Sequence, residues 1–234
     1  MKIFAVVPAR SKSKRFKNKN ISILGKKPLF MHSINFAKKL SFISKIIFST
    51  DSKKYMNLIK NNKNIIFHKR SKKASSDRAM EEDVLKDLVH FFKDKKIKQP
   101  SAFLWLRPTH PLRSLPVFEK AYKIFKKHHT TVMIVHREES RLFQSRNQYL
   151  TPINKHLKNK SMVRSQDCDP MYSIFSGEFF KLQKTITKKF LGQKLMFVVS
   201  PKKTKVDIDT KEDMDNINKI IKHNRKYLKS YLHD

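Results

Sequence analysis

Short apolar runs alternate along the chain with longer segments whose apolar residues recur at helical spacing. The short runs predict buried β-strands at Ile3–Val7, Lys45–Ser49, Ile65–His68, Ala102–Leu106, Thr131–His136, Leu195–Val199 and Val206–Ile208. The helical periodicity predicts α-helices at Pro28–Leu40, Lys53–Asn61, Met80–Lys93, Pro116–Lys127, Gly177–Phe190 and Thr210–Lys222. Pro28 and Pro116 suit the first turn of a helix, and Thr210 with Asp213 forms a capping-box pattern.

The order of these elements indicates the fold class. Strands and helices alternate over residues 1–136, which predicts an α/β fold with a Rossmann-like, mostly parallel sheet and flanking helices. Residues 137–176 break the alternation, because they are polar and weak in either periodicity. Long irregular segments inside a compact domain are usually functional or contact a partner, so we expect an inserted arm there. Residues 1–234 are otherwise expected to form a single domain.

The composition excludes several classes of site. The chain has three glycines, so neither a Walker A loop nor a G-x-G-x-x-G loop can be written. It has one cysteine, Cys168, which excludes a disulfide framework and a cysteine-based zinc site. Neither a signal-peptide core nor an apolar run of ~18 residues is visible. We therefore expect a soluble, cytoplasmic protein without a membrane partner.

The charge of the chain is strongly positive. Lysine and arginine number 53 against 19 acidic residues, which gives a net charge of +34. The cations are mostly lysine and are spread over the whole chain, with neither a basic tail nor a single stripe. We interpret them as a general surface bias and expect no nucleic-acid partner. A charge-driven nucleic-acid-binding protein is the alternative, and it predicts binding that depends steeply on salt.

A polar loop follows the first predicted strand and is the first candidate site. It carries six cations, namely Arg10, Lys12, Lys14, Arg15, Lys17 and Lys19. Ligands bind beyond the carboxyl ends of the strands in open α/β sheets, and guanidinium and ammonium groups pair with phosphate. The loop is therefore a candidate phosphate site, and a solvated basic loop is the alternative.

Two carboxylates near the end of the chain form the second candidate. Asp207 and Asp209 would point to one face of a strand, because side chains alternate along it. Mg²⁺ is commonly held by one or two carboxylates with substrate phosphate and water. The alternative is a strand end with Asp209 beside the N-terminus of a helix, where the dipole favours it.

Two further polar segments end predicted strands. Ser49-Thr50-Asp51-Ser52 follows the second strand, and its alternative role is to cap the next helix. The segment from Arg107 to Arg113 is a two-proline turn that carries two arginines.

Taken together, these motifs resemble the acylneuraminate cytidylyltransferase family, which comprises CMP-N-acetylneuraminic acid synthetases. The matching residues, in the family's order, are Ala9, Arg10, Ser13, Lys14, Lys19 and Asn20, then Ser49-Thr50-Asp51, then Pro108-Thr109, Pro111-Leu112 and Arg113, then Arg164, Gln166, Pro170 and Tyr172, and finally Asp207-Ile208-Asp209-Thr210. The resemblance covers about residues 2–220. It implies a fold of the nucleotide-diphospho-sugar transferase type.

The resemblance also implies an activity. Such enzymes join CTP to an acidic 2-keto sugar, of sialic, legionaminic or pseudaminic acid type, to give a CMP-sugar and pyrophosphate with Mg²⁺. They serve the biosynthesis of cell-surface polysaccharides. A homodimer is implied, in which the arm around Arg164 completes the sugar site of the neighbouring subunit.

The resemblance assigns roles by position. Arg10, Ser13, Lys14 and Lys19 are implied to hold the triphosphate, Asn20 and Arg70 to lie near the nucleoside, and Asp207 and Asp209 to hold Mg²⁺. Arg107, Arg113, Arg164 and Gln166 are implied to bind the sugar. Arg10, Lys19 and Asp209 are implied to be catalytic.

The chain departs from the family pattern mainly on the sugar side. Lys12 replaces the loop glycine, and Arg107 replaces a glutamine and is interpreted as a clamp for the sugar carboxylate. Other departures are Arg78, Met80, Glu81, Ser173, Phe175 and Ser176. A nucleotidyltransferase for Kdo or another polysaccharide precursor, and a degenerate homologue, therefore remain alternatives.

Overall fold

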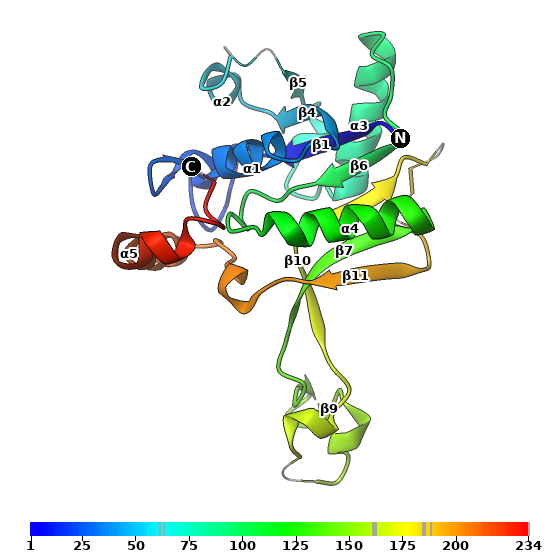
Figure 1. Cartoon of the computed structure of the whole chain (residues 1–234), viewed down its shortest axis with the longest axis vertical. Helices are drawn as coiled ribbons and strands as arrows, with labels where there is room; N and C mark the ends of the chain where they lie inside the picture. Colours follow the sequence, from blue (N-terminus) through cyan, green and yellow to red (C-terminus); the bar gives the residue numbers. More distant parts are fainter. Residues whose placement is uncertain (61, 63, 161–162, 184–185, 188, 234) are drawn as a thin grey trace.

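The computed structural model describes residues 1–60, 62, 64–160, 163–183, 186–187 and 189–233. Its centre is a seven-stranded sheet in the order β11-β7-β10-β6-β1-β4-β5 (Figure 1). The strands are β1 Ile3–Pro8, β4 Ile43–Thr50, β5 Ile65–Lys69, β6 Ala102–Trp105, β7 Thr131–Arg137, β10 Tyr172–Lys181 and β11 Leu195–Val199. Only β10 is antiparallel to its neighbours. The predicted α/β class with a mostly parallel sheet is confirmed.

Helices cover both faces of the sheet. They are α1 Leu29–Lys38, α2 Lys53–Asn57, α3 Glu81–Asp94, α4 Leu115–His128 and α5 Lys211–Leu228. Successive residues of a strand point to opposite faces. Ala5 and Val7 of β1 accordingly pack in the cluster that includes α1 and α4, and Phe4 and Val6 pack in the cluster with α3. This arrangement leaves the carboxyl ends of β1 and its parallel neighbours together at one edge.

One predicted helix is wrong. Residues Gly177–Phe190 were expected to be helical, but Gly177–Lys181 belong to β10, which runs between β6 and β7. Phe179 and Phe180 are buried in the clusters on opposite faces. A strand that is buried on both faces reads as a continuous apolar run, which periodicity cannot distinguish from a helix.

The predicted strand at Val206–Ile208 is also wrong. The segment is a loop without a strand ladder, held by a hydrogen bond from the Ile208 N–H to the Thr109 carbonyl (2.9 Å). Ile208 is fully buried beneath α5, whereas Asp207 and Asp209 are partly exposed. The expected alternation of side chains therefore survives without a strand.

The other predicted helices occur close to their expected positions. α2 is shorter than the predicted Lys53–Asn61, and Asn61 lies outside the described residues. Ser52 caps α2 by accepting a hydrogen bond from the Tyr55 N–H. The capping box of Thr210 and Asp213 is confirmed at the start of α5. No described helix is long and apolar enough to cross a membrane.

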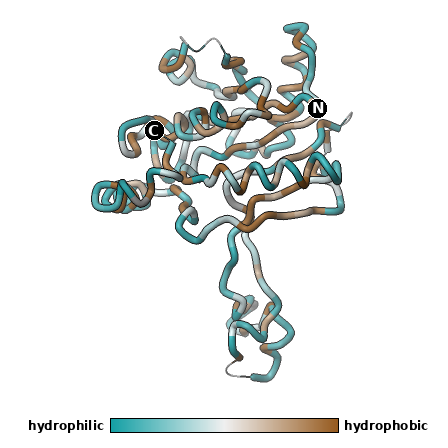
Figure 2. The backbone as a smooth tube through the Cα atoms, viewed as in Figure 1, coloured by the Kyte–Doolittle hydropathy of each residue, from teal (hydrophilic) through white to brown (hydrophobic). Residues whose placement is uncertain are grey.

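The segment between β7 and β10 projects from the body as an arm (Figure 1). It contains the hairpin of β8 Phe143–Arg146 and β9 Tyr149–Pro152, and the short 3₁₀ turns Lys155–Leu157 and Ser165–Asp167. Residues 161 and 162 of the predicted arm lie outside the described residues. Figure 2 shows the arm as largely hydrophilic with a few hydrophobic stretches. An arm was predicted here, and its role in dimerisation stays a prediction.

Candidate functional site

A cavity of about 510 Å³ lies at the carboxyl ends of the parallel strands. Its lining includes many of the residues singled out from the sequence, namely Arg10, Ser13, Lys14, Lys19, Asn20, Arg70, Arg107, Thr109 and Asp209. They come from the loop after β1, the ends of β5 and β6, and the loop before α5. The structure therefore brings the loop after β1, the turn at Arg107 and Asp209 together at one site, as expected for an open α/β sheet, whereas Ser49–Ser52 and Asp207 lie outside the lining.

The loop after β1 is held in place by two side chains. The carboxylate of Asp51, at the end of β4, accepts hydrogen bonds from the Ser11 backbone N–H (2.7 Å) and hydroxyl (2.9 Å). Asn20 is buried, and its side-chain amide donates to the Arg10 carbonyl (2.8 Å). The bonds to Asp51 tie the start of the loop to the end of β4, and the bond from Asn20 joins the two ends of the loop, so that its cations stand around the cavity.

Carboxylates pair with the loop cations at the cavity wall. Asp209 contacts Lys19 (2.9 Å) and Arg15 (2.6 Å) through its two oxygens. Asp77 contacts Lys14 (2.9 Å) and Arg10 (3.4 Å). A hydrogen bond from Lys14 and nearby positive charge lower the pKa of Asp77. The cavity wall thus carries several cations, and their carboxylate partners are partly exposed, so a ligand can replace them.

Lys12, which replaces the loop glycine of the family, does not obstruct this cavity. It is exposed and lines a neighbouring hollow, which shares Ser13, Lys14 and Asp77 with the cavity, but it does not line the cavity itself. Its backbone is not among the described positions with positive φ. A side chain at this position is therefore accommodated without backbone strain.

Asp209 lines the cavity, and Asp207 lies near it, outside the lining and next to His110. Burial, followed by the charge of Asp209, raises the pKa of Asp207. Asp207 also lies 3.7 Å from His110, whose pKa burial lowers to about 3. No group of three or more His, Cys, Asp or Glu side chains that could hold a metal occurs in the described chain. The two carboxylates fit a cation that substrate phosphates help to bind, because such a cation would relieve their repulsion.

Arg107 and Glu81 line another part of the cavity wall, and Glu178 is buried behind Arg107. The Arg107 guanidinium lies 2.7 Å from the Glu81 carboxylate and 2.5 Å from the Glu178 carboxylate. Glu178 is almost fully buried (2% exposed), and this burial raises its pKa despite the charge of Arg107. Arg107 is thus committed to two protein carboxylates, of which Glu81 is the more exposed. A sugar carboxylate would have to displace Glu81 to be clamped as expected.

Three of the residues expected to bind the sugar lie outside the cavity lining. Arg113 is fully buried, and its guanidinium donates to the carbonyls of Arg107 (2.6 Å) and Ser176 (3.3 Å). It therefore supports the Arg107 turn from beneath. Arg164 and Gln166 lie on the exposed surface of the arm, where Arg164 pairs with Asp167 (2.9 Å).

Several residues at the site were missed from the sequence. Asp77 and Glu178 were not assigned, and Glu81 was noted only as a departure. Glu178 was hidden inside the wrongly predicted helix, although a lone acid in the apolar run Gly177–Phe180 signals a buried partner. Asp77 carries no comparable local signal, because its contacts with Lys14 and Arg10 are distant in sequence.

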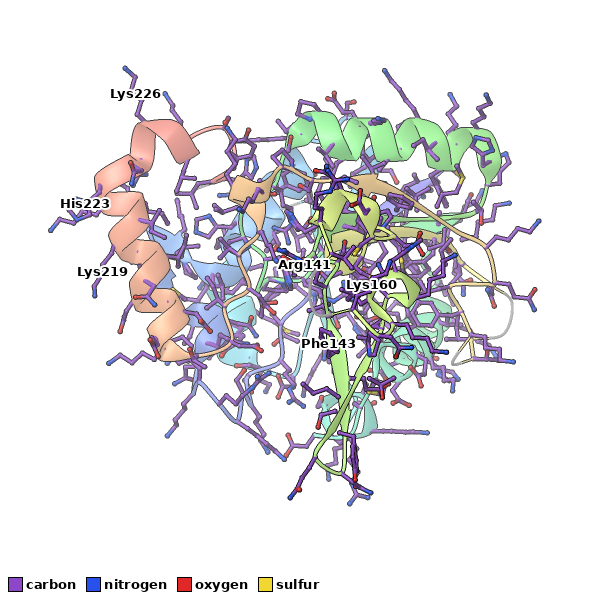
Figure 3. The ribbon with its side chains drawn as sticks, turned by 90° about the horizontal axis from the view of Figure 1, so that it is seen from below. Arg141, Phe143, Lys160, Lys219, His223 and Lys226 are labelled. Atoms are coloured by element: carbon purple, nitrogen blue, oxygen red, sulfur yellow. The ribbon has the colours of Figure 1, made fainter. Side chains whose placement is uncertain are left out.

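Much of the positive charge lies away from this site. Figure 3 shows Lys219, His223 and Lys226 pointing outward from α5, and Arg141 and Lys160 on the arm. Such a distribution agrees with a general surface bias.

Comparisons with known proteins show the family of the chain. A family model described as cytidylyltransferase matches residues 4–231. The chain is 28% identical over 220 residues to an N-acylneuraminate cytidylyltransferase of Escherichia coli O18:K1:H7, covering 92% of this chain and 51% of that one. It is 33% identical over 126 residues to a CMP-N,N'-diacetyllegionaminic acid synthase of Legionella pneumophila, covering 54% of each. The chain thus spans about half the length of the Escherichia coli relative, and its match with the Legionella relative spans about half of both chains.

Solved structures share the fold. One is a CMP:2-keto-3-deoxy-manno-octonic acid synthetase complexed with CTP, with a TM-score of 0.63, 12% identity and coverage of 96% of this chain and 100% of that one. Another is a 4-diphosphocytidyl-2C-methyl-D-erythritol synthase, with a TM-score of 0.67, 8% identity and coverage of 94% and 99%. At these identities the likeness concerns the fold alone. The family model spans nearly the whole chain, and the chain belongs to the cytidylyltransferase family.

Proposed function

We propose that this protein joins CTP to an acidic 2-keto sugar and releases a CMP-sugar and pyrophosphate. The observation that carries the proposal is the convergence of Arg10, Lys14, Lys19 and Arg70 with Asp209 around one cavity. The family supports a cytidine nucleotide, and the names of the relatives support a sugar acid of sialic or legionaminic type.

The triphosphate is expected to bind the loop after β1. Its oxygens would replace Asp77 as partners of Arg10 and Lys14, and Asp209 as a partner of Lys19. The Arg guanidinium offers a two-point contact to phosphate, and Lys offers a point charge. In the triphosphate held in this way, the anomeric hydroxyl of the sugar attacks the α-phosphorus. The bond between the α-phosphorus and the oxygen of the β-phosphate breaks, pyrophosphate leaves, and the hydroxyl proton is released. Catalysis then rests on positioning and on neutralising phosphate charge.

Asp207 and Asp209 are the residues that would hold Mg²⁺. When bound, the cation neutralises phosphate charge and polarises the phosphoryl oxygen. Lys19 contacts one of the Asp209 oxygens, so it stands where the metal and the phosphates would meet.

The sugar acid is expected at the Arg107 end of the cavity. There its carboxylate would take the place of Glu81, the exposed partner of Arg107, while Glu178 keeps hold of the other side of the guanidinium. The sialic, legionaminic and pseudaminic acid named in the relatives all belong to the candidate substrates.

The remaining sugar contacts are expected from a second subunit. Arg164 and Gln166 lie on the arm, outside the lining of the cavity of their own chain. The arm also exposes large apolar side chains, among them Tyr149 (78%) and Leu150 (68%). Exposed apolar groups that lie close together are typical of a surface that binds another protein. These features support a homodimer in which each arm reaches the neighbouring cavity.

The decisive experiment measures pyrophosphate release from CTP with Mg²⁺ over a panel of sugar acids. The panel holds N-acetylneuraminic, legionaminic and pseudaminic acid and Kdo, with a reaction lacking sugar and reactions with ATP, GTP and UTP as controls. Release that requires both CTP and one of the first three sugars is the expected result. Release with Kdo alone would favour the alternative sugar, and no release with any sugar would overturn the enzymatic proposal in favour of a degenerate homologue.

A further inference from the structure

A chain of hydrogen bonds runs behind Arg70, away from the cavity. The Arg70 Nε–H donates to the Ser49 hydroxyl (2.9 Å), which lies 3.0 Å from Nδ1 of His68. Nε2 of the same histidine lies 3.2 Å from the Asp87 carboxylate. Ser49 and His68 are paired residues on the adjacent parallel strands β4 and β5, and Asp87 lies on α3. The four side chains therefore link the cavity to the sheet and to a helix.

The direction of each bond follows from the chemistry of the groups. Guanidinium nitrogen can only donate, so the Ser49 oxygen accepts from Arg70 and its own proton is left for His68. Nδ1 of the imidazole therefore accepts, and the proton lies on Nε2, which donates to the carboxylate. Burial lowers the pKa of His68 to about 4, so the ring is neutral near pH 7, as this tautomer requires. Each hydrogen bond from Arg70 to Asp87 therefore joins one donor to one acceptor.

Ser49, His68 and Asp87 are the residue types of a hydrolytic triad, but the geometry excludes that role. In such triads a serine that substrate can reach is hydrogen-bonded to the histidine base. Here Ser49 is fully buried, and its oxygen already accepts a bond from Arg70. His68 is buried as well, at 1% exposure. The series of hydrogen bonds ends at Arg70, which lines the cavity. Ser49, His68 and Asp87 can therefore affect a ligand in the cavity only through Arg70.

Arg70 needs such support because of its neighbours. Burial lowers the pKa of Arg70 to about 10, and the charge of Arg10 adds to this effect while the charges of Asp51 and Asp87 oppose it. Burial and Arg10 both act against the charged guanidinium at the cavity, so a hydrogen bond that fixes its orientation is of use there. The bond to Nε fixes the plane of the guanidinium and leaves its two terminal amino groups for a ligand. Asp87 also accepts from the Ser71 N–H (2.8 Å), which ties the backbone beside Arg70 to the same acceptor.

We propose that Ser49, His68 and Asp87 are positioning residues that hold the Arg70 guanidinium in the orientation that binds the nucleotide. The inference rests on the proposed function, because it takes the ligand of the cavity to be CTP. It predicts that the chain of hydrogen bonds controls the affinity for CTP and leaves the chemical step largely unchanged, since Ser49, His68 and Asp87 do not line the cavity.

The test compares CTP binding and turnover in four variants. Ser49→Ala and Asp87→Ala each interrupt the series of hydrogen bonds behind Arg70. Both are expected to raise the Kd and KM for CTP by about tenfold, as for the loss of one hydrogen bond to a charged group. The kcat of both variants should stay within about twofold of that of the original protein. Asp87→Asn keeps an acceptor oxygen for His68 and Ser71 and is expected to restore near-normal affinity. Ser44→Ala is the matched control, because this serine is on the same strand and its hydroxyl bonds the Ile3 carbonyl at the opposite end.

A double variant separates positioning from general stability. If Ser49 acts through Arg70, Ser49→Ala combined with Arg70→Ala binds CTP no more weakly than Arg70→Ala alone. Additive losses in the double variant, or normal CTP affinity in both Ser49→Ala and Asp87→Ala, would overturn the inference while the proposed function stands. Failure of the unaltered protein to bind CTP in calorimetry would overturn the proposed function and this inference with it.

Discussion

At the scale of single residues, the wall of the cavity carries ion pairs whose carboxylates a ligand could replace. Asp209 holds Lys19 and Arg15, and Asp77 holds Lys14 and Arg10. Partly exposed pairs of this kind contribute little to stability, because water screens them. These pairs hold the cations in place until phosphate binds the cation or a metal ion binds the carboxylate.

Replacing Asp209 by asparagine tests this exchange. Asp209→Asn preserves the size of the side chain and removes its charge. The rate of pyrophosphate release is expected to fall by about 100-fold or more, because the variant would bind the metal ion that neutralises phosphate charge more weakly. The unfolding temperature should change little. Asp215→Asn is the control, since Asp215 is an exposed acid on α5, which follows the loop of Asp209. Full activity of Asp209→Asn would show that the metal assignment is wrong.

Arg107 is different, because one of its partners is buried. In Arg107→Gln the Glu178 carboxylate loses its contact inside the protein, which is expected to cost about 3 kcal/mol. This loss corresponds to a fall of about 6–12 °C in the unfolding temperature for a chain of this size. We also expect the preference among sugar acids to change more than the affinity for CTP.

A second substitution separates these two effects of Arg107→Gln. Adding Glu178→Gln removes the buried charge, so the double variant should recover most of the lost unfolding temperature in calorimetry while the sugar preference stays altered. If Arg107→Gln proves as stable as the original protein, the contact with Glu178 is not the stabilising pair described above.

At the scale of elements, the start of α5 positions the acidic loop. The Asp213 carboxylate accepts hydrogen bonds from the Asp209 N–H (2.9 Å), the Thr210 N–H (2.8 Å) and the Thr210 hydroxyl (2.8 Å). The Thr210 hydroxyl in turn accepts from the Asp213 N–H (3.1 Å). The helix cap therefore also fixes the backbone of a candidate metal ligand.

Removing the cap is expected to affect both stability and turnover. Asp213→Ala should lower the free energy of unfolding by ~1 kcal/mol, or about 2–4 °C in the unfolding temperature. It should also reduce pyrophosphate release, because the Asp209 backbone loses its anchor. Glu212→Ala changes an exposed acid in the same turn and should do neither. Loss of stability without loss of turnover would mean that the cap does not position Asp209.

At the scale of the whole molecule, buried histidines make stability depend on pH. His68, His136 and His233 lie on different elements and are at most 2% exposed. Burial lowers the pKa of each to about 4. In the unfolded chain the same groups bind a proton near pH 6.5. As the pH falls from 7 towards 4, the unfolded state therefore takes up protons that the folded state does not, and the folded state loses stability.

Thermal unfolding measured between pH 7 and pH 5 tests this linkage. We expect the unfolding temperature to fall by at least about 5 °C over this range, since each 1 kcal/mol corresponds to about 2–4 °C. His233→Gln should make the fall smaller, whereas His223→Gln, an exposed histidine on α5, should leave it unchanged. An unfolding temperature that does not respond to pH would contradict the assignment of neutral, buried histidines.

Local signals in the sequence determined much of the fold and part of the site. Apolar runs such as Ile3–Val7 and Ala102–Leu106 are nearly the observed strands β1 and β6, because alternation and burial are written into consecutive residues. The polar residues that follow strands, including Arg10, Lys19 and Arg107, could be placed at one edge, because parallel strands end there together. The cap of Thr210 and Asp213 was equally local.

Only the tertiary structure decided which distant groups meet. The segment from Gly177 to Lys181 is a strand and not a helix because its place between β6 and β7 buries both its faces, a condition that the segment cannot reveal by itself. The same placement brings Glu178 against Arg107, and the pairing of β4 with β5 brings Ser49 against His68. Local propensity acts over a few residues, whereas strand order and register set these contacts, so the partners of each charged side chain appear only once the sheet is assembled.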